Sequence, residues 1–198
     1  KNELNSLGIA KADKIVVIPL GFELEKFLEI APRDQEEIIN IGIVGRLVPI
    51  KNHHLFLEVI QMLRRSLVNE AAPFKVKFTI VGDGQLRQEL EEFSHKLTIA
   101  DCVEFVGWKK DLVKVYSELD IVCLTSLNEG TPVSLIEAMA SGKAVIATDV
   151  GGVRDLLGQD RGIVVESNNV EAFSTGLLSL LANVDLRKRL GEQAREFV

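Results

Sequence analysis

The chain has 198 residues, of which 46% are hydrophobic and 26% are charged, and its formal net charge is −6. This composition is typical of a globular protein and allows one large domain or two small ones. The sequence has no basic stripe, no apolar run of transmembrane length and no signal or transit peptide. We therefore expect no nucleic-acid partner, no membrane span and a cytoplasmic location.

The predicted elements begin with a polar segment, residues 1–14, that contains one short helix. Residues 15–18 form a compact β-branched run, which predicts a buried strand closed by Pro19 and Gly21. Residues 23–35 are acidic, and we expect an irregular surface connection there.

From residue 38 onward, apolar strands and amphipathic helices alternate along the chain. Strands are expected at residues 38–44, 76–81, 103–106, 121–124, 144–147 and 162–165. Helices are expected after Asn52, at residues 85–96 and 111–119, from Pro132 onward, and at residues 153–157, 170–181 and 185–198. The strands are continuous apolar runs, which is typical of strands buried on both faces of a parallel sheet.

This alternation predicts an α/β fold with a doubly wound, mostly parallel, six-stranded sheet of the Rossmann-like kind. We expect one domain over residues 1–198, in which residues 1–19 are an entry segment that straps onto the rest. The chain begins at Lys1 rather than Met, and its last helix stops abruptly at Val198. We therefore expect it to be part of a longer protein.

In this architecture, ligands bind beyond the carboxyl ends of the strands. Five predicted loops with glycines or polar residues fall there and would share one rim. They contain Gly45, Arg46 and Lys51; Gly82, Asp83 and Gly84; Gly107 and Trp108; Glu129, Gly130 and Thr131; and residues 149–152.

Arg46 and Lys51 are the two cations of this rim, and they suit a phosphate group, Arg46 as a planar fork and Lys51 as a point charge. The alternative is a solvated turn before a helix. Residues 82–84 lack the third glycine of a dinucleotide-binding loop, so they are a weak signal for NAD. Their glycines still permit close approach of the backbone to a ligand.

Residues 128–142 hold two carboxylates, Glu129 and Glu137, around a predicted junction of loop and helix. We expect Thr131 to cap this helix and Pro132 to occupy its first turn. Glu137 lies in an apolar run, where a buried carboxylate is costly unless it is hydrogen-bonded. Together with the partial positive charge of the helix N-terminus, the stretch suits a polyhydroxylated, anionic ligand. The alternative is a capped core helix whose Glu137 faces water.

No metal site and no disulfide are expected. His53 and His54 are adjacent, so on a helix they point in different directions instead of chelating a metal at positions i and i+4. Cys102 and Cys123 each lie in an apolar, strand-like run and are expected to be reduced core residues.

Three remaining candidates are single side chains. Ser126 and Ser134 have no nearby base and no nucleophile elbow, which argues against a hydrolase triad. Trp108 either stacks on a nucleobase or is a half-buried aromatic residue at the end of a strand.

Several of these motifs, in this order and spacing, resemble the large retaining glycosyltransferase family 4, also known as glycosyl transferases group 1. They are the G-R-x(4)-K run of residues 45–51, the Val-Gly-Asp-Gly run of residues 81–84, and the E-x7-E pair with its helix at residues 129–142. Residues 149–152 resemble the family's later glycine turn, and residues 18–21 its entry segment. The combination covers nearly the whole chain and is specific, whereas each motif alone is not.

The resemblance implies the C-terminal, donor-binding half of a two-domain GT-B enzyme, whose N-terminal half would bind most of a glycan or lipid acceptor. Such an enzyme transfers a sugar from a nucleotide-diphosphate sugar, most commonly a UDP-sugar, with retention of configuration, in polysaccharide, glycolipid or glycoconjugate biosynthesis. No metal or other cofactor is expected, because two cations and a helix N-terminus can stabilise the departing diphosphate. The isolated chain is expected to be inactive, and the full-length protein is compatible with peripheral contact at the inner face of the membrane.

The resemblance also implies a role for each matched position. Arg46 and Lys51 would hold the pyrophosphate, Glu129 would contact hydroxyls of the donor sugar, and Glu137 would accept hydrogen bonds from the ribose. The remaining donor-binding positions belong to the loops around them: Gly45, Gly82, Trp108, Gly130, Thr131, Pro132 and Val133. The backbone of residues 130–133 would reach sugar and phosphate, and the loops at Gly82 and Trp108 would border the base.

The chain departs from the family's pattern at two positions, and two functions other than sugar transfer are also compatible with the sequence. Leu20 stands where the family usually has Asn, and Thr131 stands where it commonly has an aromatic residue, which leaves the shape of the sugar pocket open. One alternative is a nucleotide-sugar epimerase-like GT-B enzyme, which would release the nucleotide without an acceptor. The other is a non-catalytic module that binds sugar nucleotides.

Overall fold

The structure is a computed structural model that describes residues 2–16, 21–33, 38–69 and 75–198. Within these residues, six strands form one parallel sheet in the order β3-β2-β1-β4-β5-β6. Their bounds are β1 Ile38–Val44, β2 Lys75–Val81, β3 Val103–Gly107, β4 Ile121–Leu124, β5 Ala144–Thr148 and β6 Ile163–Val165. The doubly wound, Rossmann-like sheet expected from the sequence is thus confirmed.

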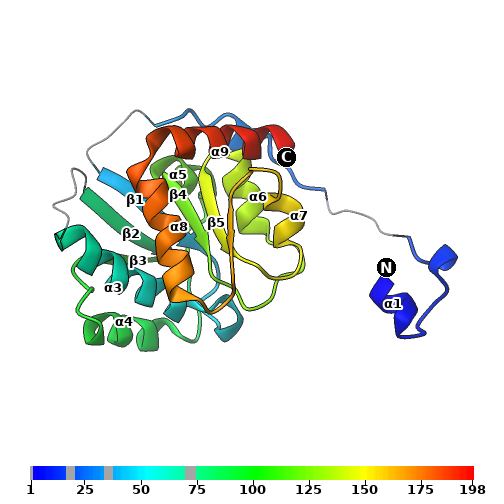
Figure 1. The fold of residues 1–198 in the computed structure, drawn as a ribbon, viewed down its shortest axis with the longest axis horizontal. Coiled ribbons are helices and arrows are strands. Elements are labelled where there is room, and N and C mark those ends of the chain that lie inside the picture. The colour runs from blue at the N-terminus through cyan, green and yellow to red at the C-terminus, as the bar shows by residue number, and fades with distance from the viewer. Residues whose placement is uncertain (1, 17–20, 34–37, 70–74) are drawn as a thin grey trace.

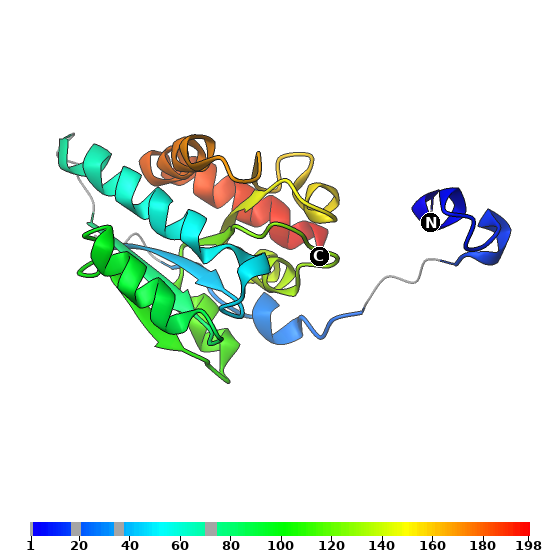
Figure 2. The ribbon, with the colours of Figure 1, turned by 90° about the horizontal axis from the view of Figure 1, so that it is seen from below.

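The helices and the 3-10 turns fill the connections between the strands. They are α1 Asn2–Ser6, η1 Ala12–Lys14, α2 Glu25–Leu28, η2 Pro49–Lys51, α3 His53–Asn69, α4 Arg87–Lys96, α5 Leu112–Glu118, α6 Val133–Ala140, α7 Val153–Leu157, α8 Val170–Ala182 and α9 Val184–Phe197. Figure 1 shows α3 and α8 in front of the sheet, and Figure 2 shows helices on both sides of it.

Apolar side chains pack on both faces of the sheet, as continuous apolar strands require. On one face, α3, α4 and α8 bury a core around Phe56, Ile80 and Phe173. On the other face, α2, α5, α6 and α7 bury a second core around Tyr116 and Met139. Helix α9 contributes side chains to both cores and so joins the two layers.

Two local predictions are wrong. Residues 23–35 were expected to be irregular, but they contain the single helical turn α2, which buries Phe27 against the edge of the Tyr116 ring. The helix after β4 begins one residue later than expected: Pro132, with φ −77° and ψ 89°, is its N-cap, no side-chain hydrogen bond caps it, and Thr131 is exposed. Pro132 has a helical φ, but its extended ψ keeps it outside the helix.

The predicted strand at residues 15–18 lies partly outside the described residues. Residues 15 and 16 are described and belong to no strand, whereas residues 17–20, which include most of the expected entry motif, are outside the description. The segment that carries α1 lies apart from the sheet in both views (Figures 1 and 2), and its Leu7 and Ile9 are exposed.

Candidate functional site

The order in which successive strands are added to the sheet reverses between β1 and β4, which are neighbours although two strands separate them in the chain. This place is the topological switch point of the sheet. Connections leave these two strands toward opposite faces of the sheet, and ligands of doubly wound folds bind beyond the carboxyl ends of the strands at such a point. Lys51 follows β1 and Glu129 follows β4, so two of the predicted site residues flank this point.

Lys51 and Glu129 form an ion pair between the turn after β1 and the loop after β4. The distance between Lys51 Nζ and Glu129 Oε1 is 2.5 Å, and the two side chains are 21% and 9% exposed. The stem of Lys51 passes close to Gly45, because a Cβ built on Gly45 would lie 3.9 Å from Cδ and Cε of the lysine. In an ion pair this shielded from solvent, each charge compensates the other. Loss of either partner would leave the remaining charge uncompensated in a poorly solvated place.

Three further hydrogen bonds fasten the loop after β4 around this pair. The Ser126 hydroxyl donates to Glu129 Oε1 at 2.6 Å, and the Thr125 hydroxyl donates to the carbonyl of Lys51 at 2.9 Å. The Leu127 backbone N–H donates to the carbonyl of Ile50 at 2.8 Å. The loop after β4 and the turn after β1 are therefore held together at several points.

The glycines of the loop after β2 face the backbone of a neighbouring loop. Gly82 has φ +138°, and a Cβ added there would lie 1.9 Å from the carbonyl oxygen of Gly45; one added to Gly84 would lie 2.5 Å from that of Leu47. The Gly82 N–H also donates to the carbonyl of Gly107 at 2.9 Å. Close backbone approach is thus needed here, but between loops.

The turn after β5 uses the same device against the loop after β4. Gly151 has φ +50°, and an added Cβ would lie 1.7 Å from the carbonyl oxygen of Glu129; one on Gly152 would lie 2.7 Å from that of Gly130. The loops after β3, β2, β1, β4 and β5 are therefore linked in sheet order into one row. The predicted shared rim is confirmed.

Glu137 lies in the middle of α6 and is half-buried. The hydroxyl of Tyr116, on α5, lies 3.0 Å from Glu137 Oε2 and 3.0 Å from the carbonyl oxygen of Ser134, and its single proton is shared between these two acceptors. Burial raises the pKa of Glu137, whereas the Tyr116 hydrogen bond and the nearby Lys26 partly offset the rise. The carboxylate is neither a buried, unpaired charge nor a freely solvated one.

The other predicted positions differ in exposure: Pro132 is buried, and Gly45 and Gly82 are partly buried. Arg46, Gly130, Thr131 and Val133 are exposed, and Trp108 is 71% exposed. Within the described part of the chain, Arg46 has no ion pair, so its charge is available to a ligand. Trp108 is not the half-buried aromatic that one prediction expected.

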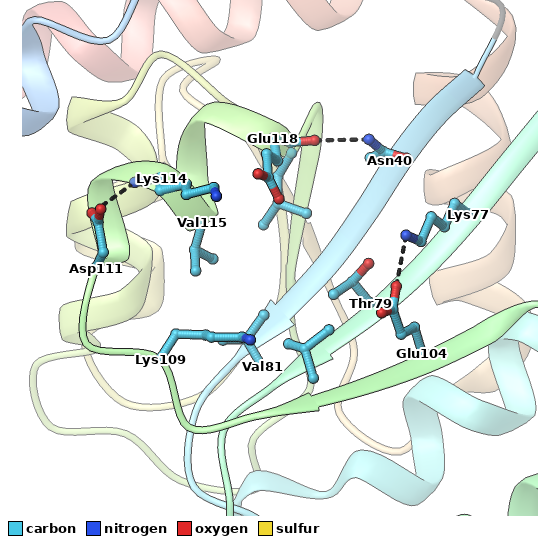
Figure 3. A pocket seen from close by; sticks show the side chains of 12 residues that line it. Asn40, Lys77, Thr79, Val81, Glu104, Lys109, Asp111, Lys114, Val115 and Glu118 are labelled. Carbon is cyan, nitrogen blue, oxygen red and sulfur yellow. Dashed lines mark hydrogen bonds and ion pairs between the residues drawn. The ribbon is translucent and has the colours of Figure 1, made fainter.

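A groove of about 330 Å³ lies beside the rim, on the face of the sheet that carries α5. Figure 3 shows Thr79 on β2 and Val115 on α5 on opposite sides of it, with Lys109 toward one end. Lys77 and Glu104 form an ion pair at 2.6 Å along its wall. The groove includes none of Arg46, Lys51, Glu129 or Glu137, so it is separate from the switch-point site.

No cluster of three or more metal-ligating side chains occurs among the described residues. His53 is fully buried, and burial next to Lys51 lowers its pKa to about 4, so its ring is neutral near pH 7. His54 instead lies 2.9 Å from Glu89 through its Nε2 atom. Cys102 and Cys123 are free thiols, and no helix in the described ranges is long and apolar enough to cross a membrane.

Two side chains of this site were missed from the sequence. Ser126 was considered only as a nucleophile, yet it supports Glu129. Tyr116 was not singled out in the sequence, although a fully buried tyrosine normally needs a hydrogen-bond partner. A signal for Ser126 existed: it lies just past a fully apolar strand and three residues before Glu129.

Comparisons with known proteins identify the family of the chain. The model of the family "Glycosyl transferases group 1" matches residues 25–197. The chain is 30% identical, over 83% of its length, to UDP-Gal:alpha-D-GlcNAc-diphosphoundecaprenol alpha-1,3-galactosyltransferase of Escherichia coli, of which the match covers 44%. The chain spans about half the length of the curated relatives it matches.

Solved structures share the fold. A mutant of S. aureus TarM, crystallised in complex with fondaparinux, alpha-GlcNAc-glycerol and UDP, is similar with a TM-score of 0.81 and 26% identity, over 98% of this chain and 38% of that one. The C-terminal domain of a glycosyl transferase group 1 family protein (LpcC) from Francisella tularensis is similar with a TM-score of 0.70 and 24% identity, over 80% of this chain and 83% of that one.

Proposed function

The chain belongs to the glycosyl transferases group 1 family and has the fold of a C-terminal GT-B glycosyltransferase domain, and from that premise we propose that it binds the nucleotide-diphosphate sugar of a retaining glycosyltransferase. The observation that carries the proposal is the Lys51–Glu129 ion pair at the switch point between β1 and β4. It sets a cation suited to phosphate beside a carboxylate suited to sugar hydroxyls.

The charges of the rim suit the reaction. In the transfer, the bond between the anomeric carbon and a phosphate oxygen breaks, and its electrons remain on the departing diphosphate. Arg46, exposed and without an ion pair among the described residues, and Lys51 supply positive charge where that negative charge develops. One preorganised donor aimed at such a charge contributes about 3 kcal/mol to catalysis. This arrangement needs no metal ion.

The two carboxylates divide the donor between them in this proposal. Glu129 accepts hydrogen bonds from the transferred sugar, and Glu137 accepts them from the ribose. The loops at Gly82 and Trp108 border the base, and the backbone around residues 130–133 lies against sugar and phosphate. UDP is the proposed nucleotide, supported by the UDP-Gal in the name of the E. coli relative and by the UDP in the TarM structure.

The full protein would add an acceptor-binding N-terminal half, and the acceptor would be a glycan or a lipid-linked sugar. The proposed parent is a cytoplasmic enzyme that contacts the membrane peripherally. The relative that acts on a diphosphoundecaprenol-linked sugar, according to its name, supports a lipid-linked acceptor. Residues 1–19 would lead from the acceptor half into this domain.

Calorimetric titration of the chain with UDP, GDP, ADP and their sugar conjugates tests the proposal. We expect one nucleotide and its sugar conjugates to bind in the micromolar to millimolar range, without sugar transfer by this chain alone. Absence of binding for every nucleotide would overturn the donor-site assignment. Release of nucleotide by the full-length protein without any acceptor would favour the epimerase-like alternative.

A further inference from the structure

Glu129 receives both of its described hydrogen bonds on a single oxygen. Lys51 Nζ and Ser126 Oγ lie 2.5 Å and 2.6 Å from Oε1. In the described part of the chain, nothing donates to Oε2. Because a carboxylate oxygen has two lone pairs, two donors fill Oε1, and Oε2 is left to accept from a ligand.

Ser126 is itself held rigidly. Its side chain is fully buried, and its backbone carbonyl accepts a hydrogen bond of 2.6 Å from the hydroxyl of Thr148, at the end of β5. Lys51, by contrast, reaches Glu129 through a long side chain whose ammonium group would also be attracted to a diphosphate. Of the two donors, only the serine has no competing task.

We propose that Ser126 is a positioning residue, which holds Glu129 so that Oε2 faces the hydroxyls of the donor sugar while Lys51 turns to the diphosphate. This inference rests on the proposed function and adds a residue to it. When a donor binds and Lys51 shares its charge with the phosphates, the Ser126 hydrogen bond keeps the carboxylate in place. Neither its nucleophilicity nor a base is needed for this role.

The proposal separates the sugar part of the donor from its nucleotide part. Ser126→Ala should weaken binding of a nucleotide sugar about tenfold, because a hydrogen bond to a charged group is lost from the group that contacts the sugar. Binding of UDP, which has no sugar to contact Glu129, should change less than about twofold. A purely structural role would weaken both ligands alike.

The test titrates the chain with UDP and with whichever of UDP-galactose, UDP-glucose and UDP-N-acetylglucosamine the unmodified chain binds best. Ser94→Ala is the matched control, since Ser94 is 2% exposed and donates one hydrogen bond, to the carbonyl of Glu91 within α4, a helix that holds none of the predicted site residues. Thermal unfolding of both variants measures the shared cost of losing a buried hydroxyl. Ser126→Cys, which keeps a weak donor of similar size, should lose less affinity for the sugar nucleotide than Ser126→Ala.

A second measurement ties the effect to Glu129. In a Glu129→Ala background, Ser126→Ala should cause no further loss of sugar-nucleotide affinity, because the group that it positions is gone. Equal losses for UDP and the UDP-sugar, or an additive double variant, would overturn the inference and leave the proposed function standing. If the unmodified chain bound neither ligand, the proposed function would fail first and this inference with it.

Discussion

Glu129 and Glu137 lie eight positions apart around one loop and helix, and their surroundings differ in kind. Glu129 is 9% exposed and is compensated by the full charge of Lys51, which comes from another loop, and by the Ser126 hydroxyl. Glu137 is half-buried and receives a hydrogen bond from the neutral hydroxyl of Tyr116, and burial raises its pKa. The first carboxylate lies within a charged network, whereas burial raises the pKa of the second.

This difference fits different ligands. A carboxylate paired with a cation can share that cation with a departing diphosphate. A carboxylate supported by a hydroxyl, in a less polar setting, suits a neutral diol, which adds donors but no charge. The comparison therefore predicts that changes at the two sites affect separate parts of the donor.

The largest expected effect comes from removing either carboxylate. In the full-length enzyme, Glu129→Ala and Glu137→Ala should each reduce transfer by about 10²-fold or more, in line with the loss of one preorganised group. Binding separates them: Glu137→Ala should weaken UDP itself, and Glu129→Ala only the UDP-sugar. Glu58→Ala, at an exposed position of α3, is the control. Near-normal turnover in both variants would refute their roles in transfer, and equal effects on UDP binding would refute the division between them.

The next effect comes from the glycine turn behind Glu129. Gly151→Ala places a side chain on a backbone with φ +50° and within 1.7 Å of the Glu129 carbonyl. We expect a loss of about 1–3 kcal/mol in the free energy of unfolding, and weaker binding of the UDP-sugar. Urea titrations measure the free energy of unfolding of each variant. Gly130→Ala, where an added Cβ meets nothing within 4 Å, should leave that free energy nearly unchanged. Equal stability of the two variants would contradict the packing argument.

A smaller effect is expected at the support of Glu137. Tyr116→Phe keeps the buried ring but removes the hydroxyl, which costs about 1 kcal/mol of stability and raises the pKa of Glu137 further. UDP affinity at neutral pH should fall a few-fold, by roughly the worth of one hydrogen bond. Calorimetry with the UDP-sugar should show the same loss as with UDP. A loss confined to the sugar conjugate would reverse the assignment of the two carboxylates.

The smallest effect is a pH dependence. Because the pKa of Glu137 is raised above its ordinary value of 4.5, the folded chain binds that proton more tightly than the unfolded chain. The stability that the protonated group contributes is therefore present at low pH and is lost as the pH rises from 4.5 through the raised pKa. Glu137→Gln should remove this decline in urea titrations at a series of pH values. An unchanged pH profile would indicate an unperturbed carboxyl group.

Nucleotide binding should show the opposite trend, since in the proposed site the ribose donates to the ionised carboxylate of Glu137. The ratio of wild-type to Glu137→Gln affinity for UDP should fall as the pH is lowered toward the raised pKa. Because the wild type and the variant are titrated with the same nucleotide, the ionisation of its phosphates affects both affinities equally and cancels in the ratio.

The strands and the shared rim could be predicted because their signals are local. A strand buried on both faces is a continuous apolar run, so β1, β4 and β5 could be read almost to the residue. The single turn α2 was missed because it is too short for a helical period and has acidic residues around Phe27.

Contacts between distant loops could not be read in this way. Residues 74 to 78 positions apart make the bonds between the turn after β1 and the loop after β4. In the sequence, Gly82 and Gly151 suggest positions where a ligand could approach the backbone. Only the folded chain shows that the space beside each glycine is occupied by the backbone of another loop. The identities of the nucleotide and the sugar are proposals, because the motifs found in the sequence do not distinguish one nucleobase or one sugar epimer from another.

The interlocked glycine turns have a thermodynamic consequence. Surface loops usually pay an ordering cost when they close on a ligand, through lost backbone entropy. Here Gly82 lies against Gly45 and Gly151 against Glu129 before any donor arrives, so much of that cost falls on folding instead of binding. The N–H groups of Gly45, Gly82 and Leu127, each bonded to an adjacent segment, should then exchange slowly with deuterium in the unliganded chain, and adding a donor should slow them little further.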